Sequence, residues 1–304
     1  MAKDVAGARI AVIGAGLMGH GIAQVFALAG HEVKITDTVV SNLDTVAARI
    51  SANLRDLGDD ERAVERVQAT IDLTDAVHDA DYVVEAIAEN LEAKKKLFAE
   101  LERRTRPDTI LASNTSVIPI TAIMQDLSRR ERAVGTHWWN PPFLVPLVEV
   151  IETQWTSPQV VAWTMELHAA AGKTPAHVKK DVPGFIGNRL QHALWREAIA
   201  LVEHGICDAK TVDDVVKASF GRRLAVLGPL ENADQVGTDL TLAIHDIVLP
   251  AIEDRPGPSP YLQDLVADGK LGFKSGEGFQ TWTPQQQTAL RTRVMKHLKA
   301  MRDT

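Results

Sequence analysis

The sequence predicts an α/β domain with a doubly wound parallel sheet, followed by an all-α domain. Three observations lead to this expectation. Short apolar segments alternate with amphipathic ones from residue 9 to residue 181, glycines cluster between the first two segments, and only helical periodicity is found after residue 184. We therefore divide the chain into domains at residues 1–182 and 183–304.

The first domain opens with a strand, a helix and a second strand. Residues 9–13 form an apolar run, residues 17–29 have the period of a helix that Gly30 ends, and residues 32–36 include Val33, Ile35 and Thr36. Two strands joined through a helix pair in parallel, because a parallel connection needs such a crossover. This unit therefore predicts the start of a parallel sheet.

The same alternation continues to the boundary. A helix is expected at residues 39–57, and a shorter charged helix at residues 59–71. Buried-strand patterns follow at residues 81–87, 109–114, 132–139, 146–152 and 175–181, interspersed with helical patterns at residues 91–105, 118–127 and 157–172. Ser157 is placed to cap the last of these helices, with Pro158 at its first position. In the second domain, helices are expected at residues 187–204, 209–219, 239–253, 259–267 and 284–301.

Composition excludes several classes of partner. The formal net charge of −7 argues against nucleic acid or an anionic membrane, since both are bound by basic surfaces. A single cysteine, Cys207, allows no disulfide within the chain and suggests no cysteine-based metal site, so no metal is expected. The first ten residues do not resemble a secretory signal, and no stretch approaches the roughly 20 apolar residues of a membrane span. We expect a cytoplasmic protein.

The segment "GAGLMG" lies between the first strand and the first helix and predicts a dinucleotide-binding loop of the Rossmann type. Gly14 permits a tight turn, Gly16 lets the backbone approach a pyrophosphate, and Gly19 lets the helix pack closely on the strand. Leu17 and Met18 complete the loop, whose free N–H groups face the phosphates. Asp37, at the end of the second strand, is suited to a ribose diol and repels a 2′-phosphate, so NAD is expected rather than NADP. The alternative is that the glycines only form a packing turn.

The segment "VGTHWWNPPFLVPLVEV" places His137 and Glu149 on two expected strands joined by a proline-rich connection. A dehydrogenase needs a base to take the hydroxyl proton as hydride leaves, and imidazole titrates near neutral pH. A carboxylate on the other ring nitrogen would orient that base and stabilise its charged form. The alternative is a buried histidine bonded to backbone, with Glu149 facing solvent. The upstream NAD motif favours the catalytic interpretation.

Several motifs in this order resemble the 3-hydroxyacyl-CoA dehydrogenase family. They are "GAGLMGHGIAQVFALAGHEV", "EAIAENLEAKKKLF", "ASNTS", "GTHWWNPP", "PLVEVI", "DVPGFIGNRL" and "LGFKSGEGF". The resemblance implies an N-terminal NAD-binding domain, a C-terminal helical domain for substrate binding and dimerisation, and a homodimer. It also implies that His137 is the base and Glu149 its partner, and that Ser116 and Asn188 hold the reacting oxygen. The cofactor contacts that it implies beyond the glycine loop and Asp37 are Glu89, Lys94, Asn114, Ser116 and Asn140.

Two departures from the family concern the substrate. Members that act on fatty-acyl-CoA usually carry a long, lysine-rich helical hairpin, whereas residues 49–70 are short here and alternate arginines with acids. The acidic residues of this strip make it poorly suited to bind the anionic tail of CoA. The alternative is that the strip is only the solvent-exposed face of a helix. In addition, Trp138 and Trp139 either reshape the pocket or fill the core. Both features favour a small substrate without CoA.

The sequence leaves the reaction open between three possibilities. The first is oxidation of a 3-hydroxy acid, its acyl ester or a related small hydroxy or aldehyde compound. The second is oxidation of an aldehyde on a pyridine carboxylate in vitamin B6 degradation, and the third is a non-catalytic NAD-binding redox sensor or structural protein. Four basic residues are candidates for binding an acid group of the substrate: Arg189, Arg222, Arg223 and Lys274.

Overall fold

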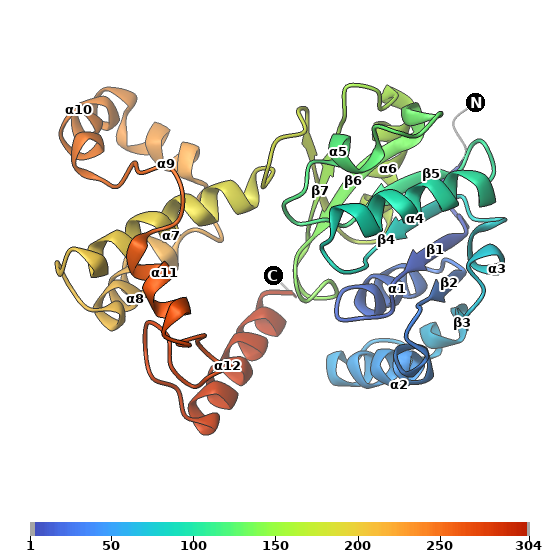
Figure 1. Cartoon of the computed structure of the whole chain (residues 1–304), viewed down its shortest axis with the longest axis horizontal. Coiled ribbons are helices and arrows are strands. Elements are labelled where there is room, and N and C mark those ends of the chain that lie inside the picture. The colour runs from blue at the N-terminus through green and yellow to red at the C-terminus, as the bar shows by residue number, and fades with distance from the viewer. Residues whose placement is uncertain (1–3, 303–304) are drawn as a thin grey trace. The chain divides into compact units, whose positions relative to one another are not determined.

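The computed structural model describes residues 4–302 and consists of two compact units (Figure 1). One contains the chain up to Arg189 together with the segment from Lys296 onward, and the other contains Leu190–Met295. Residues 1–3, which belong to the segment examined for a secretory signal, and residues 303–304 lie outside the described part. The division into sequence domains at residue 182 stays a prediction.

The first unit is built on one sheet of eight strands in the order β3-β2-β1-β4-β5-β6-β7-β8. The strands are β1 (Ile10–Ile13), β2 (Val33–Thr36), β3 (Val67–Thr70), β4 (Tyr82–Glu85), β5 (Ile110–Ser113), β6 (Ala133–Trp138), β7 (Leu147–Ile151) and β8 (Thr174–Val178). The first six strands form the doubly wound parallel arrangement that the alternation predicts, and β8 is parallel to β7.

One pair departs from the parallel expectation, because β6 and β7 are antiparallel. Only residues 139–146 join them, and a parallel connection needs a dozen or more residues to return to the same edge of the sheet. The antiparallel register places His137 directly opposite Glu149.

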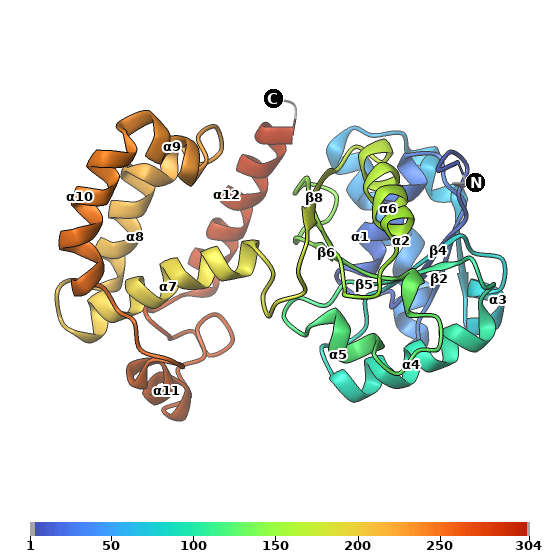
Figure 2. The same cartoon turned by 90° about the horizontal axis from the view of Figure 1, so that it is seen from above.

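Helices cover both faces of the sheet. They are α1 (Gly19–Leu28), α2 (Val40–Leu57), α3 (Leu73–Val77), α4 (Leu91–Arg104), α5 (Ile120–Met124) and α6 (Pro158–Ala170). One buried cluster joins the sheet to α1, α2 and α6 through Phe26, Ile50 and Leu167, and the other joins it to α3, α4 and α5 through Val77 and Phe98. Figure 2 shows α4 and α5 together on the side away from α6. As expected, Ser157 caps α6 by accepting a hydrogen bond from the Val160 N–H.

The expected charged helix at residues 59–71 is wrong. The chain forms a short 3₁₀ helix, η1 (Glu61–Arg66), and then the edge strand β3. Val67 and Thr70 are the half-buried ends of a four-residue strand that pairs only with β2, so its alternation is too short to be distinguished from a helical period. The short helix α3 was likewise absent from the expected elements.

The second unit is helical, as expected, apart from isolated bridges near Gly272 and Glu277. Its helices are α7 (Gly187–Glu203), which starts in the first unit, α8 (Ala209–Ala218), α9 (Pro229–Val236), α10 (Thr238–Val248), α11 (Pro260–Ala267) and α12 (Pro284–Arg302), which ends in the first unit. Helix α9, with Pro229 in its first turn, was not expected from the sequence. Within residues 4–302, no helix is both long and apolar enough to cross a membrane.

Candidate active site

The glycine loop between β1 and α1 combines a tight turn with open space. Gly14 has a φ of 103°, and a Cβ at this position would lie 2.6 Å from the carbonyl oxygen of Ala86. A Cβ at Gly19 would lie 1.7 Å from the carbonyl oxygen of Gly14, so both positions require glycine for the loop to close. A Cβ at Gly16 would meet nothing within 4 Å. The loop is therefore tight on its protein side and free to receive a pyrophosphate on the other.

Asp37 follows β2 and binds the same loop. Its Oδ2 accepts a hydrogen bond from the Ala15 N–H at 2.7 Å and another from Asn42 Nδ2 at 3.0 Å, while Oδ1 accepts from the Val39 N–H at 2.8 Å. Burial raises the pKa of this carboxyl, but the hydrogen bonds from Val39, Ala15 and Asn42 outweigh burial and hold the pKa below its usual range. A fixed carboxylate beside the glycine loop fits the ribose of a dinucleotide. The donors and spaces present at this edge of the sheet therefore fit NAD.

His137 and Glu149 are in direct contact within the sheet. His137 Nδ1 lies 2.7 Å from Glu149 Oε2, and the two side chains are almost wholly buried. The other carboxylate oxygen, Oε1, accepts hydrogen bonds from the N–H groups of Ile186 (2.8 Å) and Gly187 (3.0 Å). The buried glutamate thus has three donors, and its alternative placement on a solvent face is excluded by the structure.

The hydrogen bonds of Glu149 determine which nitrogen of His137 carries the proton. Burial raises the pKa of Glu149, but the bonds from His137, Gly187 and Ile186 together lower it below the usual range, so the carboxylate is ionised near neutral pH. An ionised carboxylate only accepts hydrogen bonds, hence Nδ1 is the donor and neutral His137 keeps its lone pair on Nε2. In residues 4–302 this nitrogen has no hydrogen-bond partner. It is positioned to take a proton from a ligand.

The turn before α7 holds this arrangement through a strained backbone. Phe185 has a φ of 49°, in the left-handed region that a bulky residue avoids, and follows Gly184 with a φ of 74°. The Phe185 side chain is buried, and its ring centroid lies 5.6 Å from that of His137. The same turn directs the N–H groups of Ile186 and Gly187 at Glu149. Strain of this kind persists where the surroundings over-determine the conformation, as at active sites.

Ser116 and Asn188 are brought together from β5 and α7. Ser116 lies in the turn after β5 and is exposed, and Asn188 Nδ2 donates a hydrogen bond to its carbonyl oxygen at 2.8 Å. Asn114 Oδ1 accepts a hydrogen bond from the Trp138 N–H at 2.9 Å, which joins the ends of β5 and β6. Asn140 is exposed in the connection between β6 and β7. These four expected site residues therefore lie within one compact unit.

Lys94 belongs to a buried polar network centred on Glu85, a residue that the sequence analysis did not select, and the exposed Glu89 lies at the edge of this network. Lys94 Nζ lies 2.6 Å from Glu85 Oε1 and 3.3 Å from Glu89 Oε2, and Ser113 donates a hydrogen bond to Glu85 Oε2 at 2.6 Å. Burial raises the pKa of Glu89, whereas the hydroxyl of Thr115, Lys94 and the nearby N–H groups lower it below the usual range. Glu85 could have been selected from the sequence, because it is a carboxylate inside the buried strand pattern of β4 and a buried charge needs a partner.

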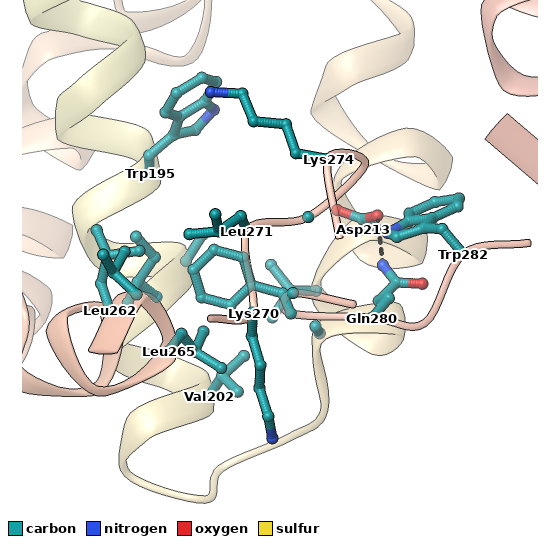
Figure 3. A pocket seen from close by; sticks show the side chains of 18 residues that line it. Trp195, Val202, Asp213, Leu262, Leu265, Lys270, Leu271, Lys274, Gln280 and Trp282 are labelled. Carbon is teal, nitrogen blue, oxygen red and sulfur yellow. Dashed lines mark hydrogen bonds between the residues drawn. The ribbon is translucent and has the colours of Figure 1, made fainter. Parts of the chain in front are cut away.

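The remaining candidates differ in where they lie. Trp138 is 2% exposed and its ring packs against Phe26 and His168, so it fills the core, which was one of the two alternatives. Trp139 is half-buried, with its ring centroid 5.4 Å from that of His137. Lys274 lines a cavity of about 620 Å³ in the second unit (Figure 3). Arg189, Arg222 and Arg223 are exposed, and Cys207 is half-buried.

Two family models match the chain. Residues 9–182 match the NAD-binding domain of 3-hydroxyacyl-CoA dehydrogenase, and residues 184–282 match the C-terminal domain of the same enzymes. The chain belongs to the 3-hydroxyacyl-CoA dehydrogenase family. Like its relatives in this family, it is an NAD-dependent dehydrogenase.

Relatives within the family include enzymes with and without CoA in their names. The chain is 36% identical to 5-formyl-3-hydroxy-2-methylpyridine 4-carboxylate 5-dehydrogenase of Mesorhizobium japonicum over 298 residues, which cover 96% of each protein. It is 39% identical to the mitochondrial hydroxyacyl-coenzyme A dehydrogenase of Homo sapiens, covering 91% of this chain and 92% of that one.

The similar solved structures also include enzymes with and without CoA in their names. A crystal structure of the pyridine dehydrogenase, described as an NAD⁺-dependent dismutase, matches with a TM-score of 0.90 at 36% identity and covers 97% of each chain. The (S)-3-hydroxybutyryl-CoA dehydrogenase of Ralstonia eutropha matches with a TM-score of 0.76 at 31% identity, covering 90% of this chain and 99% of that one.

Proposed function

We propose that the chain oxidises a hydroxyl or hydrated aldehyde group of a small substrate, with His137 as the general base and Glu149 as its partner. The observation that carries this proposal is the 2.7 Å contact between His137 Nδ1 and Glu149 Oε2, which leaves the Nε2 lone pair for the substrate proton. As that proton arrives, Glu149 stabilises the imidazolium that forms. Bound NAD supplies the hydride acceptor, C4 of its nicotinamide ring.

The other site residues are proposed to orient the two ligands. We assign the substrate oxygen to the Ser116 hydroxyl and the Asn188 amide, because one Asn188 hydrogen is used on the Ser116 carbonyl and the second remains for a ligand. We assign the cofactor to the glycine loop from Gly14 to Gly19, to Asp37 and to Glu89, which Lys94 holds in place. Asn114, Ser116 and Asn140 complete the nicotinamide side.

We propose that the substrate lacks CoA. In the strip at residues 49–70, Arg55 at the end of α2 pairs with Glu61 at 2.7 Å and Arg62 pairs with Asp60 at 3.0 Å, so these cations are already matched by acids. A CoA tail carries several negative charges and gains little from a surface whose charges cancel. The higher TM-score of the pyridine dehydrogenase structure also supports this choice.

A second candidate within this proposal is oxidation of an aldehyde on a pyridine carboxylate, a reaction of vitamin B6 degradation. It is supported by 36% identity and 96% mutual coverage with the pyridine carboxylate dehydrogenase. Here His137 would deprotonate a bound water or an aldehyde hydrate, and hydride would leave the same carbon to yield an acid. The half-buried Trp139 beside His137 offers an aromatic surface for a ring substrate.

The function is tested by following NADH formation with purified protein, NAD and three groups of compounds. These are free 3-hydroxy acids, their CoA esters, and aldehydes of pyridine carboxylates. We expect the highest kcat/KM in the first or third group. A higher kcat/KM for the CoA esters would contradict a substrate without CoA. If no NADH forms with any of the three groups while NAD binding is intact, the result would favour a non-catalytic NAD-binding protein.

We further propose that the second unit forms a homodimer with a second copy of the chain. Among residues 190–295, all of them described, only Ala200 and Leu265 are buried hydrophobic residues. Large apolar side chains such as Leu242 (63% exposed) and Ile247 (78% exposed) on α10 face solvent instead. Large exposed apolar areas on a protein mark interaction surfaces.

The dimer is tested by sedimentation of the variant Ile247→Glu. We expect the wild type to sediment as a dimer and Ile247→Glu as a monomer, because a carboxylate would be buried without a partner. The matched control is Ile71→Glu in the first unit, where Ile71 is 75% exposed and the substitution should leave the dimer intact. A monomeric wild type would contradict the proposal.

A further inference from the structure

Arg49, on α2, contacts the back of the glycine loop, and no motif points to this residue. Its Nη2 lies 2.6 Å from the carbonyl oxygen of Ala15 and 2.9 Å from that of Asn42, and its Nη1 lies 3.3 Å from that of Gly16. The Gly16 carbonyl also accepts a hydrogen bond from His20 Nδ1 at 2.8 Å. A charged, planar group therefore holds two successive peptide groups of the loop by their oxygen atoms.

The orientation of these carbonyls determines where the loop's amides point. In a trans peptide the C=O and N–H bonds point in opposite directions. Because the carbonyls of Ala15 and Gly16 face Arg49, the N–H groups of Gly16 and Leu17 face away from it. Within residues 4–302 neither N–H has an acceptor, and the space beside Gly16 is open. Two free donors thus face the side from which a ligand approaches.

Arg49 is also linked to the residue expected to bind ribose. It binds the backbone carbonyl of Asn42, whose side-chain Nδ2 donates to Asp37 Oδ2 at 3.0 Å. Asp37 in turn accepts from the Ala15 N–H at 2.7 Å. The guanidinium, Asn42 and Asp37 therefore enclose the start of the loop from one side. Without Arg49 the carbonyls of the pyrophosphate turn lose this donor, whereas Asp37 keeps its hydrogen bonds from the N–H groups of Ala15 and Val39.

We propose that Arg49 is a positioning residue for the pyrophosphate of NAD. It holds the loop so that the N–H groups of Gly16 and Leu17 face the phosphates, and its positive charge lies behind the same peptide groups. The proposed role rests on NAD binding by this domain and is independent of which residue is the catalytic base. Arg49 acts through the loop rather than by contact with the reacting atoms.

The test measures equilibrium binding of NAD, ADP and adenosine to Arg49→Met by calorimetry. We expect the Kd of NAD and ADP to rise about tenfold to one-hundredfold, because a group of charge-assisted hydrogen bonds is lost. The Kd of adenosine, which lacks phosphates, should change less than about twofold, well within the effect of one weak contact. The matched control is Arg55→Met on the same helix, since Arg55 is 70% exposed and pairs with Glu61 rather than with the loop. This control should bind all three ligands as the wild type does.

Two results would overturn the role of Arg49. One is an unchanged NAD affinity in Arg49→Met, and the other is an equal loss for adenosine, which would indicate a general disturbance of the domain. If Arg49→Met does not fold, the NAD affinity of Arg49→Lys tests the proposal instead. It keeps the charge but cannot span three carbonyls with one nitrogen, so wild-type NAD affinity in Arg49→Lys would also overturn the role. Because no substrate is needed, a failure here is distinguishable from a failure of His137 as base.

Discussion

Replacing His137 with asparagine is expected to lower kcat by about two to four orders of magnitude, the usual contribution of a positioned general base. The asparagine amide can still donate a hydrogen bond to Glu149 in place of Nδ1, so the buried carboxylate keeps a donor at this position. What is lost is Nε2, which is the only part of the side chain proposed to accept the substrate proton. NAD affinity should stay within about twofold, because none of the proposed cofactor contacts depends on this ring.

The matched control for this variant is His177→Asn. His177 on β8 also pairs with a glutamate, Glu152, which directly follows β7. Its Nε2 lies 2.8 Å from Glu152 Oε2, and both side chains are partly exposed. Its replacement should leave kcat nearly unchanged. A large loss of NAD affinity in His137→Asn, or an equal fall of kcat in His177→Asn, would show that His137 is not the base. Steady-state kinetics and NAD titration measure both quantities.

The first half of the sheet could be predicted from the sequence because local chemistry determines it. Gly14 and Gly19 are required by close backbone contacts that no other residue allows, and the apolar runs around them can only be buried strands. The edge strand β3 was missed since its four residues carry too little alternation to decide between helix and strand. The antiparallel pairing of β7 with β6 is not visible in the apolar pattern of either strand, because buried strands carry the same pattern in both directions. Only the short connection at residues 139–146 determines the direction.

The candidate site was predictable where its residues carry motifs and unpredictable where tertiary contacts create it. His137 and Glu149 were paired on their chemistry and spacing, and the register of β6 and β7 places them opposite each other. Glu85 joins Lys94 from nine residues before it and Ser113 from a neighbouring strand, so only the assembled sheet shows the network. The left-handed backbone of Phe185 is likewise invisible in the sequence, because a phenylalanine gives no sign of a positive φ.

Replacing Glu149 with glutamine is expected to have the second large effect, a fall of kcat by about three orders of magnitude. Glu149 accepts hydrogen bonds on both oxygens, from His137 on one side and from Ile186 and Gly187 on the other. An amide has one acceptor oxygen. If that oxygen faces the backbone, the NH₂ group faces Nδ1 and moves the ring proton to Nε2, which removes the base. If it faces His137, two buried N–H groups lose their acceptor, at a cost of about 1–3 kcal/mol in the free energy of unfolding.

The pH dependence of stability separates this role of Glu149 from a purely catalytic one. Hydrogen bonds from His137, Gly187 and Ile186 outweigh burial and lower the pKa of Glu149 in the folded protein. A carboxyl with a lowered folded pKa stabilises the fold fully above its ordinary pKa of 4.5, and that contribution is lost as the pH falls through the folded value. Urea unfolding should therefore give a higher free energy of unfolding for the wild type than for Glu149→Gln near neutral pH, and this difference should become smaller in acid. Glu152→Gln, the control from the more exposed pair, should show a smaller difference throughout. A difference in the free energy of unfolding that does not change with pH would mean that Glu149 is not held as a carboxylate. His137 would then lack the partner that keeps its Nε2 free.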